Sequence, residues 1–339
     1  IGQRNVIKVP SAPDNSIRID ALRDAAYAAV KAGKRIACFV ATMGTTDAFG
    51  IDDLASVKKL RDELVEKCSL DYVPHIHADA VIGWAWSVFN TYDFRANPLG
   101  FRGRTVRALA AAHYRIHTLG LADSIGVDFH KTGYAPYTSS MVLVRDREEW
   151  KRIARNRALM PYLFQSGEYH PGMYSLETTR SGAGPMAALA NLLLFGREGL
   201  QVLLGHVVEA AEALREAIES HPYLTVLNGE NVGPVTLMRA YPDDVDTFTV
   251  KHREQHDADY TAKVLEHNDY NRRLFERINS EALAGRGVML SLTDCYRESD
   301  AGTPISALKS YILSPFTDAE HALTVYRHLA EAREHIRNA

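Results

Sequence analysis

The sequence predicts an α/β fold in which a mainly parallel sheet has helices on both faces, followed by a smaller α+β domain. In the first half, short and continuously apolar segments such as 35–41 and 141–144 alternate with segments of helical periodicity. This alternation is typical of βαβ units and of a buried parallel sheet. After residue 185 the pattern changes to two long helical stretches, which are followed by short strands and further helices.

The elements of the first part follow from apolar periodicity and from capping signals. Asp20 stands where a helix cap belongs and Gly33 where that helix ends, and Asp52 opens a second helix with an apolar face. We therefore expect, in chain order, a short buried strand at 6–9, a helix at 21–30, a strand at 35–41, a helix at 52–67, a strand at 73–80, a helix that includes 113–118, and strands at 122–128 and 141–144.

The second part predicts a smaller domain attached through helices. We expect helices at about 186–197 and 199–220, strands at 224–227 and 235–238, a helix near 257–281, strands near 287–293 and 306–313, and a closing helix near 317–337. The predicted domains are residues 1–200, and residues 201–339 with the connecting helix.

Composition excludes several function classes. The chain has 339 residues and a formal net charge of -3, which argues against an obligatory nucleic-acid partner. No stretch approaches 18 uninterrupted apolar residues, so no membrane partner is expected. The three cysteines are widely and irregularly spaced, which argues against a disulfide framework and favours the cytoplasm.

Three predicted strands are followed by residues that carry chemistry. Gly44-Thr45-Thr46 follows the first, His77 and Asp79 end the second, and His130-Lys131 follows the third. The carboxyl ends of parallel strands meet at one edge of a sheet, where ligands bind. A lysine amine that is partly desolvated there can attack a carbonyl to form a Schiff base, and a carboxylate can stabilise a protonated ring nitrogen. A lysine at a strand end can equally be an ordinary surface residue.

The order of these motifs resembles the group II pyridoxal-phosphate (PLP) decarboxylases, which include the aromatic amino acid, glutamate and tyrosine decarboxylases. The matching text is 41–46, 77–80, 122–124 and 130–131. The run 130–137, His-Lys-Thr-Gly-Tyr-Ala-Pro-Tyr, is most similar to the bacterial tyrosine decarboxylases. The resemblance covers most of residues 1–200. It implies the large domain of a fold-type I PLP enzyme, N-terminally incomplete.

The resemblance also implies cofactor-binding residues. Lys131 would form the Schiff base with PLP, and Asp79 would pair with the pyridinium nitrogen. The other residues that it places around the cofactor are His130 beside the Schiff base and the phosphate, Thr45 and Thr46 in the turn, and Ala80 or Val81 against the ring.

The implied activity is decarboxylation of an L-amino acid to the amine and carbon dioxide, with a tyrosine-like substrate favoured. Tyr137 matches a tyrosine that returns a proton to the substrate carbon, and His130 is a second candidate for this role. Tyr137 could instead be a packing aromatic. Arg180 could bind a substrate carboxylate or form an ion pair with Glu177. Residues 165–174 could form a lid or a plain surface loop.

Relatives in this family carry a long N-terminal portion, with a phosphate-binding loop, before the point that matches Ile1. The resemblance therefore predicts a partner. This could be a second chain that supplies the N-terminal half of the PLP domain, or identical protomers in a dimer. Cleavage of a longer chain, or an incomplete sequence, would also explain the missing portion.

Other functions remain open at this stage. Another PLP-dependent lyase, an aldehyde synthase or a transferase would share Lys131 and Asp79. A metal-dependent hydrolase could use the His75/His77 pair with His130 and Asp128, and a regulatory subunit could keep a vestigial site. Three histidines lie in polar, largely helical text and are expected to face solvent, namely His252, His256 and His267.

Overall fold

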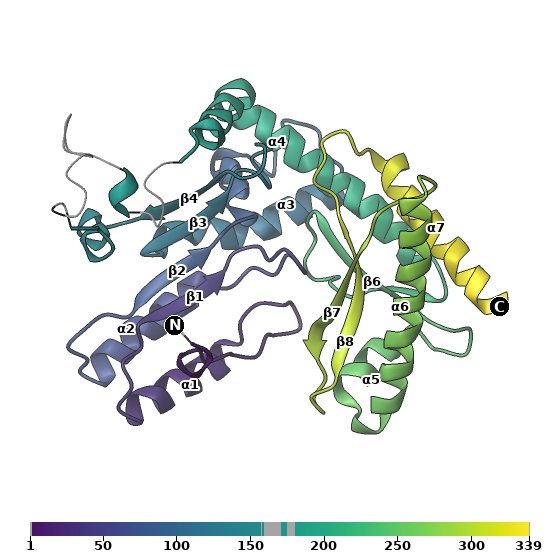
Figure 1. The fold of residues 1–339 in the computed structure, drawn as a ribbon, viewed down its shortest axis with the longest axis horizontal. Coiled ribbons are helices and arrows are strands. Elements are labelled where there is room, and N and C mark those ends of the chain that lie inside the picture. Colours follow the sequence, from purple (N-terminus) through teal and green to yellow (C-terminus); the bar gives the residue numbers. More distant parts are fainter. Residues whose placement is uncertain (1, 157, 159–170, 175–179, 339) are drawn as a thin grey trace.

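The computed structural model describes residues 2–156, 158, 171–174 and 180–338. Two four-stranded sheets form the molecule, and the long helix α4 (Ala183–Glu219) runs past both of them (Figure 1). The first sheet lies within predicted domain 1–200 and the second within 201–339. The boundary itself stays a prediction.

The first sheet has the strand order β1-β2-β3-β4. The first three strands are parallel and β4 is antiparallel to β3, which confirms the mainly parallel sheet. The bounds are Cys38–Thr42 for β1, His75–Asp79 for β2, Ser124–Asp128 for β3 and Ser140–Val144 for β4.

Helices of the first part pack on the face of this sheet that carries Phe39 and Ala78. They are α1 (Ile19–Lys31), α2 (Leu54–Lys67), the 3-10 segments η2 (Gly83–Thr91) and η3 (His117–Leu121), and α3 (Gly103–Ile116). The opposite face of β1 is different, because Cys38 is exposed and Val40 is 59% exposed. At β1, therefore, only one face of the sheet is well covered.

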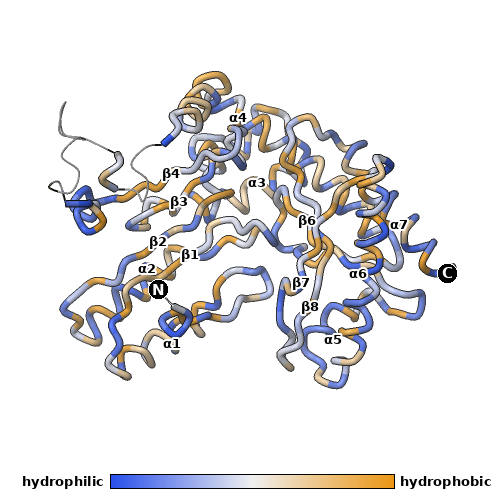
Figure 2. The backbone as a smooth tube through the Cα atoms, in the orientation of Figure 1, coloured by the Kyte–Doolittle hydropathy of each residue, from blue (hydrophilic) through white to orange (hydrophobic). Residues whose placement is uncertain are grey.

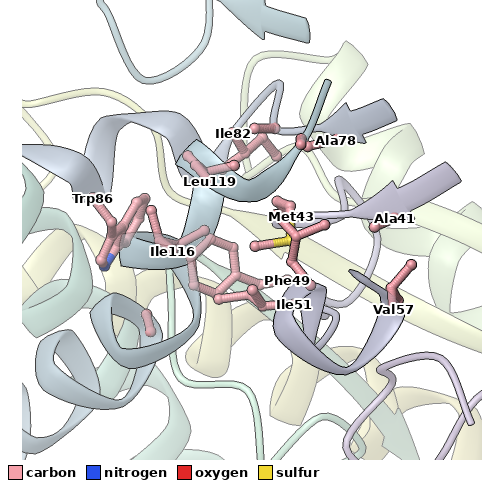
Figure 3. Packing of buried hydrophobic residues seen from close by; sticks show 14 of the residues in the cluster. Ala41, Met43, Phe49, Ile51, Val57, Ala78, Ile82, Trp86, Ile116 and Leu119 are labelled. Carbon is pink, nitrogen blue, oxygen red and sulfur yellow. The ribbon is translucent and has the colours of Figure 1, made fainter. Parts of the chain in front are cut away.

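The core under the first sheet also supports the turn after β1. Figure 3 shows Met43 and Phe49 packed beside Trp86 of η2, with the Phe49 and Trp86 ring centroids 4.7 Å apart. Gly83 is required there, because a Cβ at this position would lie 2.1 Å from the Met43 carbonyl oxygen. Gly44 has a positive φ of 102°, a conformation that favours glycine.

The predicted strand at 6–9 is wrong. The structure has a 3-10 turn, η1 (Gln3–Asn5), and no strand at 6–9, and both Val6 and Ile7 are more than half exposed. A strand is stabilised by backbone hydrogen bonds to a neighbouring strand. The described residues place no such neighbour beside this segment, so its apolar pattern was misleading.

Helix α4 joins the two parts and breaks at Gly196, which has a φ of 58°. This break confirms the two predicted helical stretches. The first half is apolar yet exposed at Leu193 and Leu194, and its first turns are coloured hydrophobic in Figure 2. Among the described helices, α4 alone has the length and composition to cross a membrane. That is weak evidence, because core helices meet the same criterion.

The second sheet is antiparallel throughout, with the order β5-β6-β8-β7. Its core also includes residues of the second half of α4. The elements are β5 (Leu224–Val226), β6 (Val235–Ala240), the short helix α5 (Val250–His256), the 3-10 turn η8 (Ala258–Tyr260), α6 (Thr261–Leu283), β7 (Ser291–Glu298), β8 (Pro304–Tyr311) and α7 (Ala319–Asn338). This confirms the smaller α+β part.

A buried charge cluster lies inside the second part. The Arg239 guanidinium on β6 is 3.1 Å from Glu254 Oε1, and His267 Nδ1 is 2.8 Å from the same oxygen. The Tyr241 hydroxyl donates to Glu254 Oε2 at 3.0 Å. The expectation that His267 faces solvent is therefore wrong, because α6 turns this residue inward onto the cluster.

The two parts meet at the turn that follows β1. Lys309 Nζ on β8 is 2.6 Å from Asp47 Oδ1, and the Asn228 side-chain amide donates to the Ala48 carbonyl at 3.0 Å. A Cβ at Gly233 would lie 2.1 Å from the Phe49 ring, so the backbone of the second part approaches this turn closely. The Lys309 side chain of β8 thus reaches the turn that follows β1.

Candidate active site

The structure brings the predicted site residues to one edge of the first sheet. Thr42 at the end of β1 is paired with Asp79 at the end of β2, and Asp79 is paired with Gly126 on β3. Asp128 ends β3, and Lys131 follows it in the next turn. Strand order and register thus place the carboxylate of Asp79 and the amine of Lys131 at the ends of neighbouring parallel strands.

Asp128 is the immediate partner of Lys131. Lys131 Nζ lies 2.8 Å from Asp128 Oδ2, and the Ser140 hydroxyl donates to Asp128 Oδ1 at 2.6 Å. Burial acts to raise the pKa of the Asp128 carboxyl. The hydrogen bonds from Lys131 and Ser140 outweigh burial and hold this pKa below its usual range.

His130 and Tyr137 lie together beside this ion pair. Their ring centroids are 4.1 Å apart, and His130 Nε2 is 3.5 Å from Asp128 Oδ2. His130 Nδ1 is 2.9 Å from the Ser139 carbonyl oxygen, which fixes the imidazole plane. The Tyr137 side chain is 74% exposed, so its hydroxyl is open to a molecule entering at this edge.

Asp79 and the two histidines of β2 occupy the same face of the sheet. His75 Nε2 and His77 Nδ1 are 2.8 Å and 2.7 Å from a single hydroxyl, that of Ser124. Burial lowers the pKa of His77, against the opposing effect of the Asp79 charge. Since a hydroxyl has one proton to donate, one imidazole accepts from Ser124 and the other donates to it.

The metal-dependent alternative has no geometric basis in the part of the chain that the structure describes. There, no three or more His, Cys, Asp or Glu side chains are grouped so as to hold a metal ion. His75 and His77 are instead bridged by Ser124, and His130 and Asp128 contact the Lys131 turn. A metal site needs at least three such ligands converging on one point.

The remaining predicted cofactor residues differ in how open they are. Thr45 Oγ1 accepts from the amides of Ala48 and Gly50 at 3.1 and 2.9 Å, so it holds the turn together, whereas Thr46 is exposed. Ala80 is 0% exposed and packs in the core with Ala78. The expected contact of Ala80 with a ring stays a prediction. Val81, which is only half-buried, is the better placed of the two.

Two substrate-side predictions stay untested. Arg180 is described and exposed, but Glu177, its expected ion-pair partner, lies outside the described residues. Most of the predicted lid at 165–174 also lies outside them, and the described remainder is the 3-10 turn η7 (Pro171–Tyr174). Arg180 thus remains a substrate candidate by prediction only.

The second part contributes a residue to this edge that sequence reasoning missed. The Tyr311 hydroxyl on β8 and the Tyr134 hydroxyl after Lys131 are both buried without a hydrogen-bond partner. Burial raises the pKa of Tyr311, and the neighbouring Tyr134, Tyr137 and Asp128 raise it further. No motif in the sequence relates β8 to the Lys131 turn, because the two segments lie far apart in the chain.

Comparison with known proteins decides the family. The sequence profile described as the pyridoxal-dependent decarboxylase conserved domain matches residues 1–238. The chain belongs to the pyridoxal-dependent decarboxylase family. This confirms the resemblance on which the site residues were assigned.

Curated relatives of this decarboxylase-family chain differ in substrate. It is 28% identical over 220 residues to an aspartate 1-decarboxylase of Aliivibrio fischeri, and 25% identical over 235 residues to an L-tyrosine decarboxylase of Enterococcus faecium. Each match covers 65% of this chain, but only 34% and 38% of the respective relatives. The chain thus spans little more than a third of the length of these relatives.

Solved structures show the same fold. The Oryza sativa protein titled TDC with PLP and tryptamine gives a TM-score of 0.69 at 16% identity, covering 99% of this chain and 59% of that one. The glutamate decarboxylase domain structure from Vibrio parahaemolyticus gives 0.66 at 18% identity, covering 98% and 54%. These likenesses confirm a fold-type I architecture for the described sheet.

Proposed function

We propose that this chain binds PLP through Lys131 and carries the catalytic lysine of an enzyme that decarboxylates an L-amino acid. One observation carries this proposal, namely that Asp79 ends β2 and Lys131 lies in the turn that follows the neighbouring parallel strand β3. The donor set fits the cofactor, because an amine can bind its aldehyde and a carboxylate can pair with its ring nitrogen. Thr46 offers an exposed hydroxyl in the turn that follows β1.

When bound, PLP would supply an electron sink for the pair of electrons left when carbon dioxide departs. The residues of this chain would do the rest. Asp79 would keep the ring nitrogen protonated, and the contacting rings of His130 and Tyr137 would line the side of the site next to Lys131. A phenol keeps its proton at neutral pH, so Tyr137 can donate one to the substrate carbon.

The substrate that we favour is an aromatic, tyrosine-like amino acid. The run 130–137 supports this choice, because it ends on the exposed Tyr137 phenol beside the site. The relatives include aspartate, tyrosine and L-2,4-diaminobutyrate decarboxylases, so the family alone leaves the substrate open. The same scaffold could also host another PLP-dependent lyase, an aldehyde synthase or a transferase.

A product assay tests this function directly. The purified enzyme, with any chain that co-purifies, is loaded with PLP and supplied separately with tyrosine, aspartate, glutamate and 2,4-diaminobutyrate. We expect carbon dioxide and tyramine in equal amounts from tyrosine. Aldehyde with ammonia would identify an aldehyde synthase. Turnover of aspartate alone would contradict the aromatic preference but keep the decarboxylase.

Replacing Tyr137 with phenylalanine isolates its hydroxyl. The ring would still stack on His130, whereas the proton donor is lost, so we expect amine formation to fall by about 100-fold or more. The measurement is the steady-state rate of amine release. The matched control is Tyr114→Phe, which removes the hydroxyl of an equally exposed tyrosine on α3. Similar rates for both variants would assign Tyr137 to packing.

We further propose that a second chain completes the PLP domain. The face of β1 that carries Val40 is open, and at the other edge of the sheet β4 exposes Met141, Val142 and Leu143. Isolated proteins rarely leave such strand edges and apolar surfaces uncovered. Three unpaired cysteines support a cytoplasmic setting for this assembly.

Native mass spectrometry of the purified enzyme tests the partner. We expect an assembly whose mass is not a multiple of the 37.7 kDa chain, and we expect Val40→Asp to release the chain from it. Val73→Asp is the matched control, because Val73 is 63% exposed but lies in the loop before β2. Full decarboxylase activity in a species made of this chain alone would contradict the proposal.

A further inference from the structure

The carboxylate of Asp128, the last residue of β3, is held by two side chains. Its Oδ2 atom is 2.8 Å from Lys131 Nζ, and its Oδ1 atom accepts the Ser140 hydroxyl at 2.6 Å. Ser140 lies directly opposite Asp128 in the antiparallel β3-β4 register. The carboxylate is thus fixed from across the sheet, and both side chains of the ion pair are mostly shielded from water, at 13% and 16% exposed.

Other titratable groups face this pair from each neighbouring element. His130 Nε2 in the turn after β3 is 3.5 Å from Asp128 Oδ2, and the Tyr137 ring contacts the His130 ring at a tilt of 44°. From β8 of the second part, Tyr311 is near enough to Asp128 to have its own pKa raised by it. Asp79 ends the neighbouring strand β2. Among these groups, Lys131 makes the shortest contact with the Asp128 carboxylate.

We infer that Asp128 is a positioning residue that binds the Lys131 ammonium, fixes its nitrogen at the strand end and retains its proton until an aldehyde arrives. This inference rests on the proposed function, in which Lys131 receives the cofactor aldehyde. An ammonium has no lone pair with which to attack a carbonyl carbon. A carboxylate 2.8 Å away in partly dry surroundings favours the ammonium form. Loss of the Asp128 carboxylate is therefore expected to change how readily Lys131 reacts with an aldehyde at a given pH.

The test uses pyridoxal, which lacks the phosphate, so that phosphate binding does not enter. The neutral Lys131 nitrogen attacks the aldehyde carbon, a carbon–nitrogen bond forms, and the aldehyde oxygen leaves as water. Borohydride then delivers hydride to the carbon–nitrogen double bond, and the stable adduct is located by peptide mass. The rate of adduct formation on Lys131 is measured from pH 6 to pH 10, on the purified enzyme with any co-purifying chain in place.

For Asp128→Asn we expect the pH profile of adduct formation to move down by about one pH unit or more, giving about tenfold faster labelling at pH 7. Asp128→Glu keeps the charge and should restore the profile of the unmodified protein. Ser140→Ala frees the carboxylate and should give an intermediate profile. Asp93→Asn, an exposed loop aspartate, should leave the profile unchanged.

Three outcomes separate the possibilities. Slower labelling of Asp128→Asn at every pH, with an unmoved profile, would give Asp128 a merely structural role and overturn the inference. If Asp128→Asn does not fold, as judged by circular dichroism, the Ser140→Ala profile decides in its place, and an unmoved profile there overturns the inference. Absence of any Lys131 adduct in the unmodified protein would instead contradict the proposed function on which the inference rests.

Discussion

Replacing Lys131 with alanine is expected to abolish the borohydride-reducible adduct with PLP and to lower decarboxylation by on the order of 10³-fold or more. The physical reason is the loss of the amine that is proposed to hold the cofactor aldehyde, in the turn after β3. The measurement is peptide mass after reduction, combined with the rate of carbon dioxide release from the loaded enzyme.

Two controls keep this prediction specific. Lys131→Arg retains a cation beside Asp128, so it should keep the fold while still forming no adduct. Lys263→Ala removes an exposed lysine on α6 and should leave both the adduct and the rate unchanged. Decarboxylation by Lys131→Ala at more than a tenth of the normal rate would contradict the assignment of this lysine.

Replacing Arg239 with alanine is expected to lower the free energy of unfolding by about 3–5 kcal/mol. The guanidinium is fully buried, and it contacts Glu254 at 3.1 Å, the Asn268 side chain at 2.8 Å and the Ser306 carbonyl at 2.6 Å. Its removal leaves the buried Glu254 carboxylate without its cation. Urea denaturation followed by circular dichroism gives the change in stability.

The matched control for Arg239 is an exposed pair on the same part of the molecule. Arg272 on α6 is 2.8 Å from Asp294, but both side chains are more than half exposed. Arg272→Ala should therefore cost less than about 1 kcal/mol. The double variant Arg239→Met, Glu254→Gln removes both charges and should recover part of the loss. A cost of under 1 kcal/mol for Arg239→Ala would mean that the buried cluster contributes little.

Much of the candidate site was predictable because it depends on local pattern and strand order. The predicted site residues stand at the ends of three apolar strands. Gly44 follows the first strand, Asp79 ends the second, and the turn with Lys131 follows the third. A parallel sheet brings such ends to one edge, so the convergence of Asp79 and Lys131 required no knowledge of loop structure. The register of β1, β2 and β3 places the carboxyl ends of these strands at one edge, whereas the cofactor roles of Asp79 and Lys131 stay predictions.

Other features depended on contacts between distant segments. Ser140 reaches Asp128 only because β4 turns back antiparallel to β3, and Tyr311 comes to the Lys131 turn from the second part. His267 looked like a solvent-facing residue on a polar helix, yet its partner Glu254 sits on a different helix. Val6 to Val9 looked like a strand but has no neighbour with which to pair.

The sequence by itself thus determined the family and most of the order of the elements, and it predicted the roles of Lys131 and Asp79, because periodicity and motif spacing are properties of the chain. Only the tertiary structure decided which carboxylate holds Lys131, that Ala80 is buried in the core, and that one face of β1 is left open. Those facts depend on strand register and on the packing of segments far apart in the chain, and neither leaves a local signal in the residues themselves.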